Sequence, residues 1–313
     1  MSKKHKNGRS FYSITIPTSL KVNWDIMSKF IEDEFNIVLK VEDNTLYLSG
    51  RNKKLMKEVG NVIIELSLSG VTYKSVEELA AIWGDYLSAR HIITYDKAGR
   101  PITPLSENQK HFIKAVQEND ITFVIGPAGT GKTYLAVAQA VGMLRSRQIN
   151  KIVITRPLVE VNEKLGFLPG DIKNKVMPFL IPIYDVLGEL FTKSELENLE
   201  KNGVIEIIPI AFMRGRTIKN SIVIADEAQN LTISQMKMLL TRIGLGTKYI
   251  IIGDVTQSDI HNGKKNGLLY VVERIKRAGS RGFGIVKMTD ADIRRHPIIT
   301  EVLKLFDNSV YQK

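Results

Sequence analysis

The sequence predicts an α/β fold with a mostly parallel sheet, preceded by a smaller α+β region. From residue 105 onward, short apolar runs alternate with segments of helical periodicity. This alternation is typical of a parallel sheet whose two faces are both covered by helices. The chain has 313 residues, 43% of them hydrophobic, so it suits two domains and can form a full core.

The chain is strongly basic, and its charge is unevenly distributed. The formal net charge is +11. Residues 1–10 carry four basic and no acidic side chains, whereas residues 20–90 carry 9 basic and 11 acidic ones. The excess therefore lies in the first ten residues and in residues 91–313. Basic residues can bind nucleic-acid phosphates, or they can simply keep a protein soluble. We favour nucleic-acid binding for this excess.

Several classes of protein are excluded or disfavoured by composition. There is no cysteine, so disulfides and thiolate metal sites are impossible, and the five histidines show no metal-ligand spacing. Residues 1–10 lack the apolar segment of a signal peptide, and no apolar stretch approaches the length of a membrane span. We therefore expect a cytoplasmic protein with no membrane association.

The N-terminal third has the pattern of a compact α+β domain. Its expected helix-strand-strand-helix core resembles a small KH-like module, but it lacks the G-x-x-G clamp of KH domains and is slightly acidic. Docking or oligomerisation is therefore favoured over RNA binding for this part. The expected elements are a short strand in 11–19, helix 23–35, strands 37–41 and 45–48, and helices 55–68 and 75–87.

Four segments follow along the chain. A basic arm with a short strand covers residues 1–19, the KH-like domain residues 20–90, a linker hairpin residues 91–104, and the α/β domain residues 105–313. The linker is expected to turn at residues 96–100. In the last segment the expected helices are 106–118, 132–146, 174–190, 194–200, 232–242 and 297–307, and the expected strands are 121–125, 151–155, 204–209, 221–225, 248–253 and 284–288.

Residues 126–133 read GPAGTGKT, which has the spacing G-x-x-x-x-G-K-T between an expected strand and an expected helix. Glycines let backbone N–H groups turn toward phosphate oxygens, and the helix N-terminus adds a positive dipole end. Lys132 can reach the β- and γ-phosphates, and the Thr133 hydroxyl can bind Mg²⁺. We therefore predict that ATP is bound by Gly126, Pro127, Ala128, Gly129, Thr130, Gly131, Lys132, Thr133 and Tyr134.

A second strand end supplies the acidic half of such a site. The apolar run 221–225 is followed directly by Asp226 and Glu227. In proteins with this phosphate loop an Asp at this place holds the hydrated Mg²⁺, and the next carboxylate can act as general base toward water. Gln257 follows another apolar strand, so its side chain is expected to face the same crevice and to sense the γ-phosphate.

Eight stretches together resemble the PhoH family over residues 105–308, in unbroken order: GPAGTGKT, TRP, EKLGFLPGD, FMRGRT, DEAQN, QMKMLLTRIG, GDVTQ and RHP. The resemblance implies a single RecA-like ATPase core related to superfamily 1 helicases, with RNA as the expected partner in single-stranded form. In superfamily 1 helicases a glutamine at the place of Gln109 reads the adenine edge, and the strand end at residues 154–157 contacts nucleic acid. Gln109 could equally be a surface glutamine on a helix. One departure is Arg294, which stands where the family has an apolar residue before Arg295.

One functional part is missing from a single lobe of this kind. Helicases of this superfamily use a second lobe to bring an arginine to the γ-phosphate, and this chain has room for one lobe. The arginine is therefore expected from a neighbouring copy in a homo-oligomeric, hexameric ring. Arg295 is the main candidate, with Arg214, Arg216 and Arg294 as alternatives. Each of these could instead pair with a local carboxylate or bind RNA phosphates.

Two function classes remain open at this point. The first is an ATPase that moves along or unwinds RNA. The second is a nucleotide-dependent switch that docks a partner, such as a nuclease, without unwinding RNA. An RNase with its own cleavage site is disfavoured, because the sequence shows no histidine pair or carboxylate cluster beyond the ATPase residues.

Overall fold

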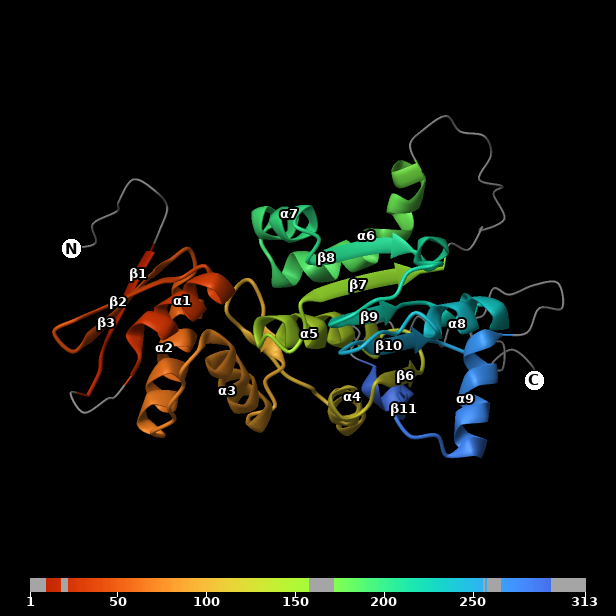
Figure 1. Cartoon of the computed structure of the whole chain (residues 1–313), viewed down its shortest axis with the longest axis horizontal. Helices are drawn as coiled ribbons and strands as arrows, with labels where there is room; N and C mark the ends of the chain where they lie inside the picture. The colour runs from red at the N-terminus through yellow and green to blue at the C-terminus, as the bar shows by residue number, and fades with distance from the viewer. Residues whose placement is uncertain (1–9, 18–21, 158–171, 256, 258–265, 294–313) are drawn as a thin grey trace, which may run out of the picture.

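The computed structural model describes residues 10–17, 22–157, 172–255, 257 and 266–293. The described residues form a three-stranded sheet packed with helices and a six-stranded sheet, and Figure 1 shows the two at opposite ends of the molecule. Within the described residues, no helix combines the length and the apolar character that crossing a membrane requires.

The N-terminal part is an antiparallel sheet of order β1-β3-β2 that packs on helices. Asp43 and Asn44 both have positive φ, of 45° and 59°, which is the geometry of a tight hairpin turn between β2 and β3. The rings of Phe30, Phe35 and Trp83 contact one another in its core. The elements are β1 (Ser10–Thr15), α1 (Trp24–Phe35), β2 (Val38–Glu42), β3 (Thr45–Gly50), α2 (Lys53–Leu68) and α3 (Val76–Ala89).

Every element expected in this part is present, with end residues shifted by up to two positions. Asn23, Asn52 and Ser75 cap the three helices through their side chains, so α1 and α3 begin one residue later than expected and α2 begins two residues earlier. The likeness to KH-like modules and the domain boundaries stay predictions, because the order of elements alone does not test them.

A short hairpin joins this part to the larger sheet. β4 (Thr94–Tyr95) pairs antiparallel with β5 (Pro101–Ile102), as expected from the turn residues. The Asp96 carboxylate stabilises the turn by accepting bonds from the backbone N–H groups of Ala98 and Arg100, at 2.9 and 2.8 Å.

The larger sheet is entirely parallel and has the order β11-β6-β10-β9-β7-β8. This confirms the predicted class, a RecA-like α/β core with a mostly parallel sheet. All the carboxyl ends lie at one edge, which is where ligands bind in open sheets of this kind. The strands are β6 (Ile121–Ile125), β7 (Lys151–Arg156), β8 (Ile205–Pro209), β9 (Ser221–Ala225), β10 (Lys248–Gly253) and β11 (Phe283–Lys287).

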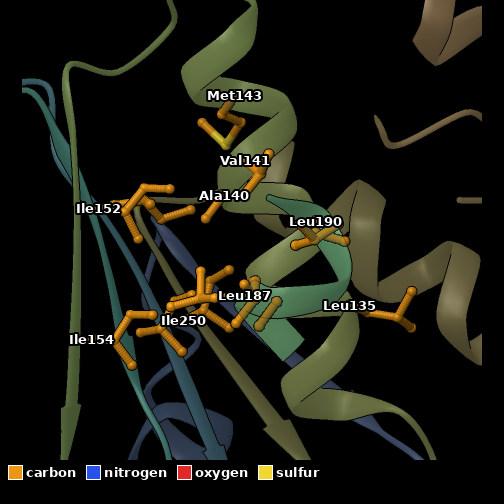
Figure 2. Close-up of a cluster of buried hydrophobic side chains, with 14 of the residues drawn as sticks. Leu135, Ala140, Val141, Met143, Ile152, Ile154, Leu187, Leu190 and Ile250 are labelled. Carbon is orange, nitrogen blue, oxygen red and sulfur yellow. The ribbon is translucent and has the colours of Figure 1, made fainter. Parts of the chain in front are cut away.

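Helices cover both faces of this sheet, because each strand is apolar on both sides. In β7, Ile152 and Ile154 belong to the cluster on one face, and Val153 between them belongs to the cluster on the other. Figure 2 shows Ile152, Ile154 and side chains of α5 and α6 in the first cluster. That face carries α4 (Glu107–Glu118), α5 (Lys132–Arg145), α6 (Ile172–Leu190) and α7 (Lys193–Lys201); the other carries α8 (Ile233–Leu240), α9 and the 3-10 turn η1 (Ile210–Met213).

Helix α9 (Gly267–Ala278) was not expected from the sequence. The basic side chains of Arg274, Lys276 and Arg277 are exposed on this helix. The helix forms because Leu268 and Val272 are buried on the side of α8, with Asn266 as N-cap and Gly279 at φ 60° ending it. The expected helix 297–307 lies outside the described residues.

Arg147, two residues beyond the end of α5, contacts the N-terminal part of the molecule. Arg147 adopts φ 55° and reaches three carboxylates of the N-terminal part. Its nitrogens lie 3.1 Å from Asp33, 3.2 Å from Glu34 and 3.3 Å from Glu77. Since α5 begins at Lys132, one helix spans the distance from the phosphate loop to this contact.

Candidate nucleotide-binding site

The phosphate loop lies between β6 and α5, as the spacing predicts. Gly129 and Gly131 adopt φ of 84° and 79°, a region that glycine enters without strain. At Gly126 a side chain is impossible for another reason, since a Cβ atom would lie 2.5 Å from the carbonyl oxygen of Met288. The Thr130 hydroxyl donates to the Pro127 carbonyl at 3.0 Å and closes the loop from inside.

Lys132 lies against this loop. Its side-chain nitrogen donates to the carbonyls of Gly126 and Pro127, at 2.7 and 2.6 Å, and the residue is only 8% exposed. The ammonium group is therefore held within the loop that would enclose phosphates, where its charge is most effective because little water surrounds it.

Asp226 and Thr133 come together from two elements. The Thr133 hydroxyl donates to the Asp226 carboxylate at 3.0 Å. Burial raises the pKa of Asp226 above its usual value, as does the neighbouring Glu227 charge, while Arg156 and the Thr133 hydrogen bond act in the opposite direction. Two adjacent oxygen groups, one an acid desolvated by burial, fit Mg²⁺, which prefers oxygen ligands and would favour the ionised carboxylate.

No cluster of three or more metal-ligating side chains occurs among the residues described. A cation at Thr133 and Asp226 would therefore need further ligands from phosphate oxygens and water, as Mg²⁺ does in phosphate-transfer sites. The residues present fit a cation that is bound together with a nucleotide.

Glu227 has an unusual backbone and two side-chain partners. Its φ is 53°, in the left-handed region that a residue with a long side chain rarely adopts. Arg156 Nη2 lies 3.0 Å from Oε1, and Gln229 Nε2 donates to Oε2 at 2.5 Å. The oxygen of the same Gln229 amide accepts from the Asp254 backbone N–H at 3.1 Å, which ties Glu227 to the end of β10.

These groups surround a cavity of about 390 Å³ at the carboxyl edge of the sheet. Its lining combines the phosphate loop with the ends of β7, β9 and β10, so strands that are far apart in sequence contribute to one site. The predicted site residues that line it are Ala128, Gly129, Gly131, Lys132, Thr133, Tyr134, Asp226, Glu227 and Gln257.

Gln109 is buried beside the phosphate loop. Its side-chain oxygen accepts from the Leu105 N–H at 2.6 Å, and its nitrogen donates to the Thr130 carbonyl at 3.2 Å. The nitrogen end of the amide thus contacts the phosphate loop, and the oxygen end contacts the segment before α4. Its expected contact with adenine stays a prediction.

The candidate arginines differ in their surroundings. Arg216 makes two bonds to Glu206, at 2.7 and 2.9 Å, and these hydrogen bonds, with help from Lys151, lower the pKa of Glu206 to about 2. Arg214 is exposed on the adjoining loop. Arg294 and Arg295 lie outside the described residues, as does the EKLGFLPGD stretch.

Two residues of the site were not singled out from the sequence. Arg156 was expected only to contact nucleic acid, and Asp254 was not considered, yet both line the cavity. A positional signal existed for each, because Arg156 ends β7 and Asp254 follows β10, at the same strand edge as Asp226. Whether these ends meet depends on strand order, which local sequence does not reveal.

The parallel sheet, the phosphate loop and the acidic end of β9 define a nucleotide-binding protein of the P-loop ATPase type. A family model described as PhoH-like protein matches residues 101–307. The chain belongs to the PhoH-like family.

Similar proteins extend this likeness over most of the chain. A PhoH-like protein of Bacillus subtilis (strain 168) is 40% identical over 92% of this chain and 93% of its own length. A PhoH-like protein of Mycobacterium tuberculosis (strain ATCC 25618 / H37Rv) is 37% identical over 94% of this chain and 87% of its own. Protein PhoH of Escherichia coli (strain K12) is 39% identical over 66% of this chain and 58% of its own.

Among solved structures, the SWI2/SNF2 ATPase core of Sulfolobus solfataricus in complex with dsDNA covers 65% of this chain and 51% of that chain. Its identity is 11% and its TM-score 0.34. A likeness of this size adds nothing to the argument from the site.

Proposed function

We propose that this protein binds and hydrolyses ATP with Mg²⁺ and acts on single-stranded RNA as a ring of identical subunits. The observation that carries the proposal is the cavity in which Lys132, Thr133, Asp226 and Glu227 meet at one sheet edge. These are the groups that phosphoryl transfer to water requires: a cradle for phosphates, a cation site and a base.

In the proposed reaction, Glu227 accepts a proton from a water molecule whose oxygen bonds to the γ-phosphorus. The bond from that phosphorus to the bridging oxygen breaks, and ADP carries away the electron pair. Lys132 binds the phosphate oxygens and Gln257 senses the γ-phosphate. Thr133 and Asp226 would hold Mg²⁺, in part through water, and the ion would supply positive charge against the β- and γ-phosphates.

The RNA part of the proposal is supported by charge, and the ring part by the single parallel-sheet lobe that the described residues form. The basic excess lies in the first ten residues and in residues 91–313, which includes the nucleotide site. A single lobe leaves the γ-phosphate arginine to a neighbouring subunit, with Arg295 first among the candidates.

A second candidate function is a switch that docks a partner such as a nuclease. The observation that favours it is the Arg147 contact, because α5 begins at Lys132 and is followed within two residues by the arginine that binds Asp33, Glu34 and Glu77. A shift of this helix on nucleotide binding would reach the N-terminal part directly.

The test is ATP turnover of the full chain with and without single-stranded RNA, with Lys132→Ala as the matched variant. We expect RNA to stimulate turnover severalfold and Lys132→Ala to lower it by more than about 10²-fold, since the lysine charge acts on the transferring phosphate. Turnover of Lys132→Ala within about tenfold of the wild type would contradict the assignment of the site. Turnover that RNA leaves unchanged would favour the switch.

A further inference from the structure

The Arg156–Glu227 ion pair is imposed by the sheet. Arg156 is the last residue of β7, whose neighbour β9 leads directly into Asp226 and Glu227. Thr155 lies opposite Ala225, and its carbonyl accepts from the Asp226 N–H at 2.9 Å. The guanidinium group is therefore held beside the acidic pair by backbone hydrogen bonds, with its side chain 19% exposed.

Both oxygens of the Glu227 carboxylate are engaged in this arrangement. Arg156 donates to one at 3.0 Å and Gln229 to the other at 2.5 Å. A carboxylate acts as a general base only when it reaches the proton that it removes. Each oxygen keeps a second acceptor position, but the two bonds fix the orientation of the carboxylate, so release of Arg156 would free Oε1 to turn toward a water molecule.

A terminal phosphate is a strong competitor for the guanidinium group. Arg156 lines the same cavity as Lys132, so an incoming γ-phosphate enters the reach of both cations. Arginine binds phosphate oxygens in a bidentate, charge-assisted way that is shorter and stronger than most hydrogen bonds. ADP lacks this phosphate group and so offers no such competition.

We propose that Arg156 positions Glu227 through this ion pair and exchanges it for the γ-phosphate when ATP binds. The exchange leaves Glu227 able to accept the proton of the attacking water. This inference rests on the proposed hydrolysis of ATP at this site. It gives the chain an arginine of its own that distinguishes ATP from ADP, in addition to any arginine supplied by a neighbouring subunit.

The experiment measures affinities of the full chain, in the presence of Mg²⁺, for ADP and for an ATP analogue with a non-hydrolysable imido bridge. Isothermal titration calorimetry is performed on the wild type, Arg156→Gln, Glu227→Gln and the double variant. Lys151→Gln is the matched control, because Lys151 begins the same strand and forms a comparable ion pair with Glu206 at 2.6 Å, outside the cavity.

We expect Glu227→Gln to tighten binding of the analogue about tenfold, because Arg156 no longer has to leave a carboxylate. Arg156→Gln should weaken the analogue about tenfold, since a charge-assisted bond is lost. ADP affinity should stay within about threefold of the wild type in both, which also shows that the variants are folded. The decisive result is the double variant, in which Glu227→Gln should bring no tightening.

Two outcomes would overturn the inference while leaving the proposed function intact. The first is that Glu227→Gln tightens the analogue equally with and without Arg156→Gln. The second is that Arg156→Gln weakens ADP and analogue alike, as a purely structural role predicts. Arg156→Lys, which keeps the charge without the fork, should fall between wild type and Arg156→Gln. If the wild type binds neither nucleotide, the proposed function itself fails.

Discussion

At the scale of single residues, Asp226 and Glu227 show how position separates two adjacent carboxylates. Asp226 is 4% exposed and accepts the Thr133 hydrogen bond, whereas the Glu227 side chain is 37% exposed and faces Arg156. The backbone of Glu227 turns into the left-handed region, which directs its side chain differently from that of its neighbour. These different surroundings fit the proposed roles, with Asp226 at the cation site and Glu227 as the base toward water.

We predict that Glu227→Gln keeps nucleotide binding but lowers turnover by about 10²–10⁴-fold, the usual contribution of a general base. Asp226→Asn should lower turnover and also raise the Mg²⁺ concentration needed for nucleotide binding, because a carboxylate charge at the cation site is lost. Single-turnover kinetics and Mg²⁺ titrations separate the two. Normal hydrolysis by Glu227→Gln would place the base elsewhere.

A second residue-scale prediction concerns Glu34, which shares Arg147 with Asp33 and Glu77. Burial raises its pKa from 4.5 to about 7, against the opposing effects of Arg147 and Arg145, and Asp33 raises it further. The folded chain therefore holds this proton more tightly than the unfolded chain. Protonated Glu34 therefore contributes to the free energy of unfolding below pH 4.5, and this contribution is lost as the pH rises through about 7. The loss is roughly 3 kcal/mol at most.

Glu34→Gln should accordingly raise the free energy of unfolding at pH 8 by about 1–2 kcal/mol and change it little at pH 5. Urea unfolding at both pH values measures this. Glu77→Gln is the control, because Glu77 binds the same arginine but its side chain is 71% exposed. An equal gain for both variants at pH 8 would show that burial of Glu34 is not the cause.

At the scale of elements, the end of β10 joins the two halves of the site. The Gly253 carbonyl accepts from the Gly126 N–H of the phosphate loop at 3.2 Å. On its other side, a Cβ atom at Gly253 would lie 2.5 Å from Leu268 of α9 and 2.9 Å from the Gln229 side-chain oxygen. The strand therefore contacts a loop, a helix and the partner of Glu227 through a residue with no side chain.

We predict that Gly253→Ala lowers the free energy of unfolding by about 1–3 kcal/mol, the usual cost of overpacking, and lowers turnover by displacing Gln229. Gly188→Ala in α6 is the matched control, since no heavy atom lies within 4 Å of its added methyl group. There we expect a gain of up to about 1 kcal/mol from helix propensity. Denaturant unfolding of both variants measures these changes. Equal free energies of unfolding for Gly253→Ala and Gly188→Ala would count against the close contact at Gly253.

At the scale of the whole molecule, the described site holds cations only on the side of its own strand ends. Lys132 and Arg156 both approach the cavity from the phosphate loop and β7. A charge on the opposite side of the γ-phosphate would have to come from a part of the chain outside the described residues, such as Arg294 or Arg295, or from another subunit. The proposed ring follows if the charge comes from another subunit.

We predict that subunits carrying Arg295→Ala and subunits carrying Lys132→Ala recover activity when mixed, because one kind retains the arginine and the other the intact loop. An arginine of this type contributes about 10³–10⁵ in rate, so the recovery is measurable against inactive parents. Arg214→Ala or Arg216→Ala subunits are mixed with Lys132→Ala subunits in the same way, and the pattern of recovery shows which arginine acts on the neighbouring site. Mixtures that stay inactive while the wild type sediments as an active monomer would exclude the ring.

The sequence by itself determined what depends on local spacing. The phosphate loop could be predicted because glycine torsions and a helix N-terminus are properties of neighbouring residues. The strands were evident because both faces of a parallel sheet are apolar. Helix α9 was missed because its stability comes from burying Leu268 and Val272 on the side of α8, which a run of basic residues conceals.

Only the tertiary structure decided which distant residues meet. Arg156 and Glu227 are separated by 71 positions and become neighbours because β7 pairs with β9. Gln109 was expected at the adenine, and the fold engages both ends of its amide with Leu105 and Thr130. The order of strands in a sheet is set by crossover connections and by the packing of helices on its faces, and neither is encoded in the spacing of any single segment.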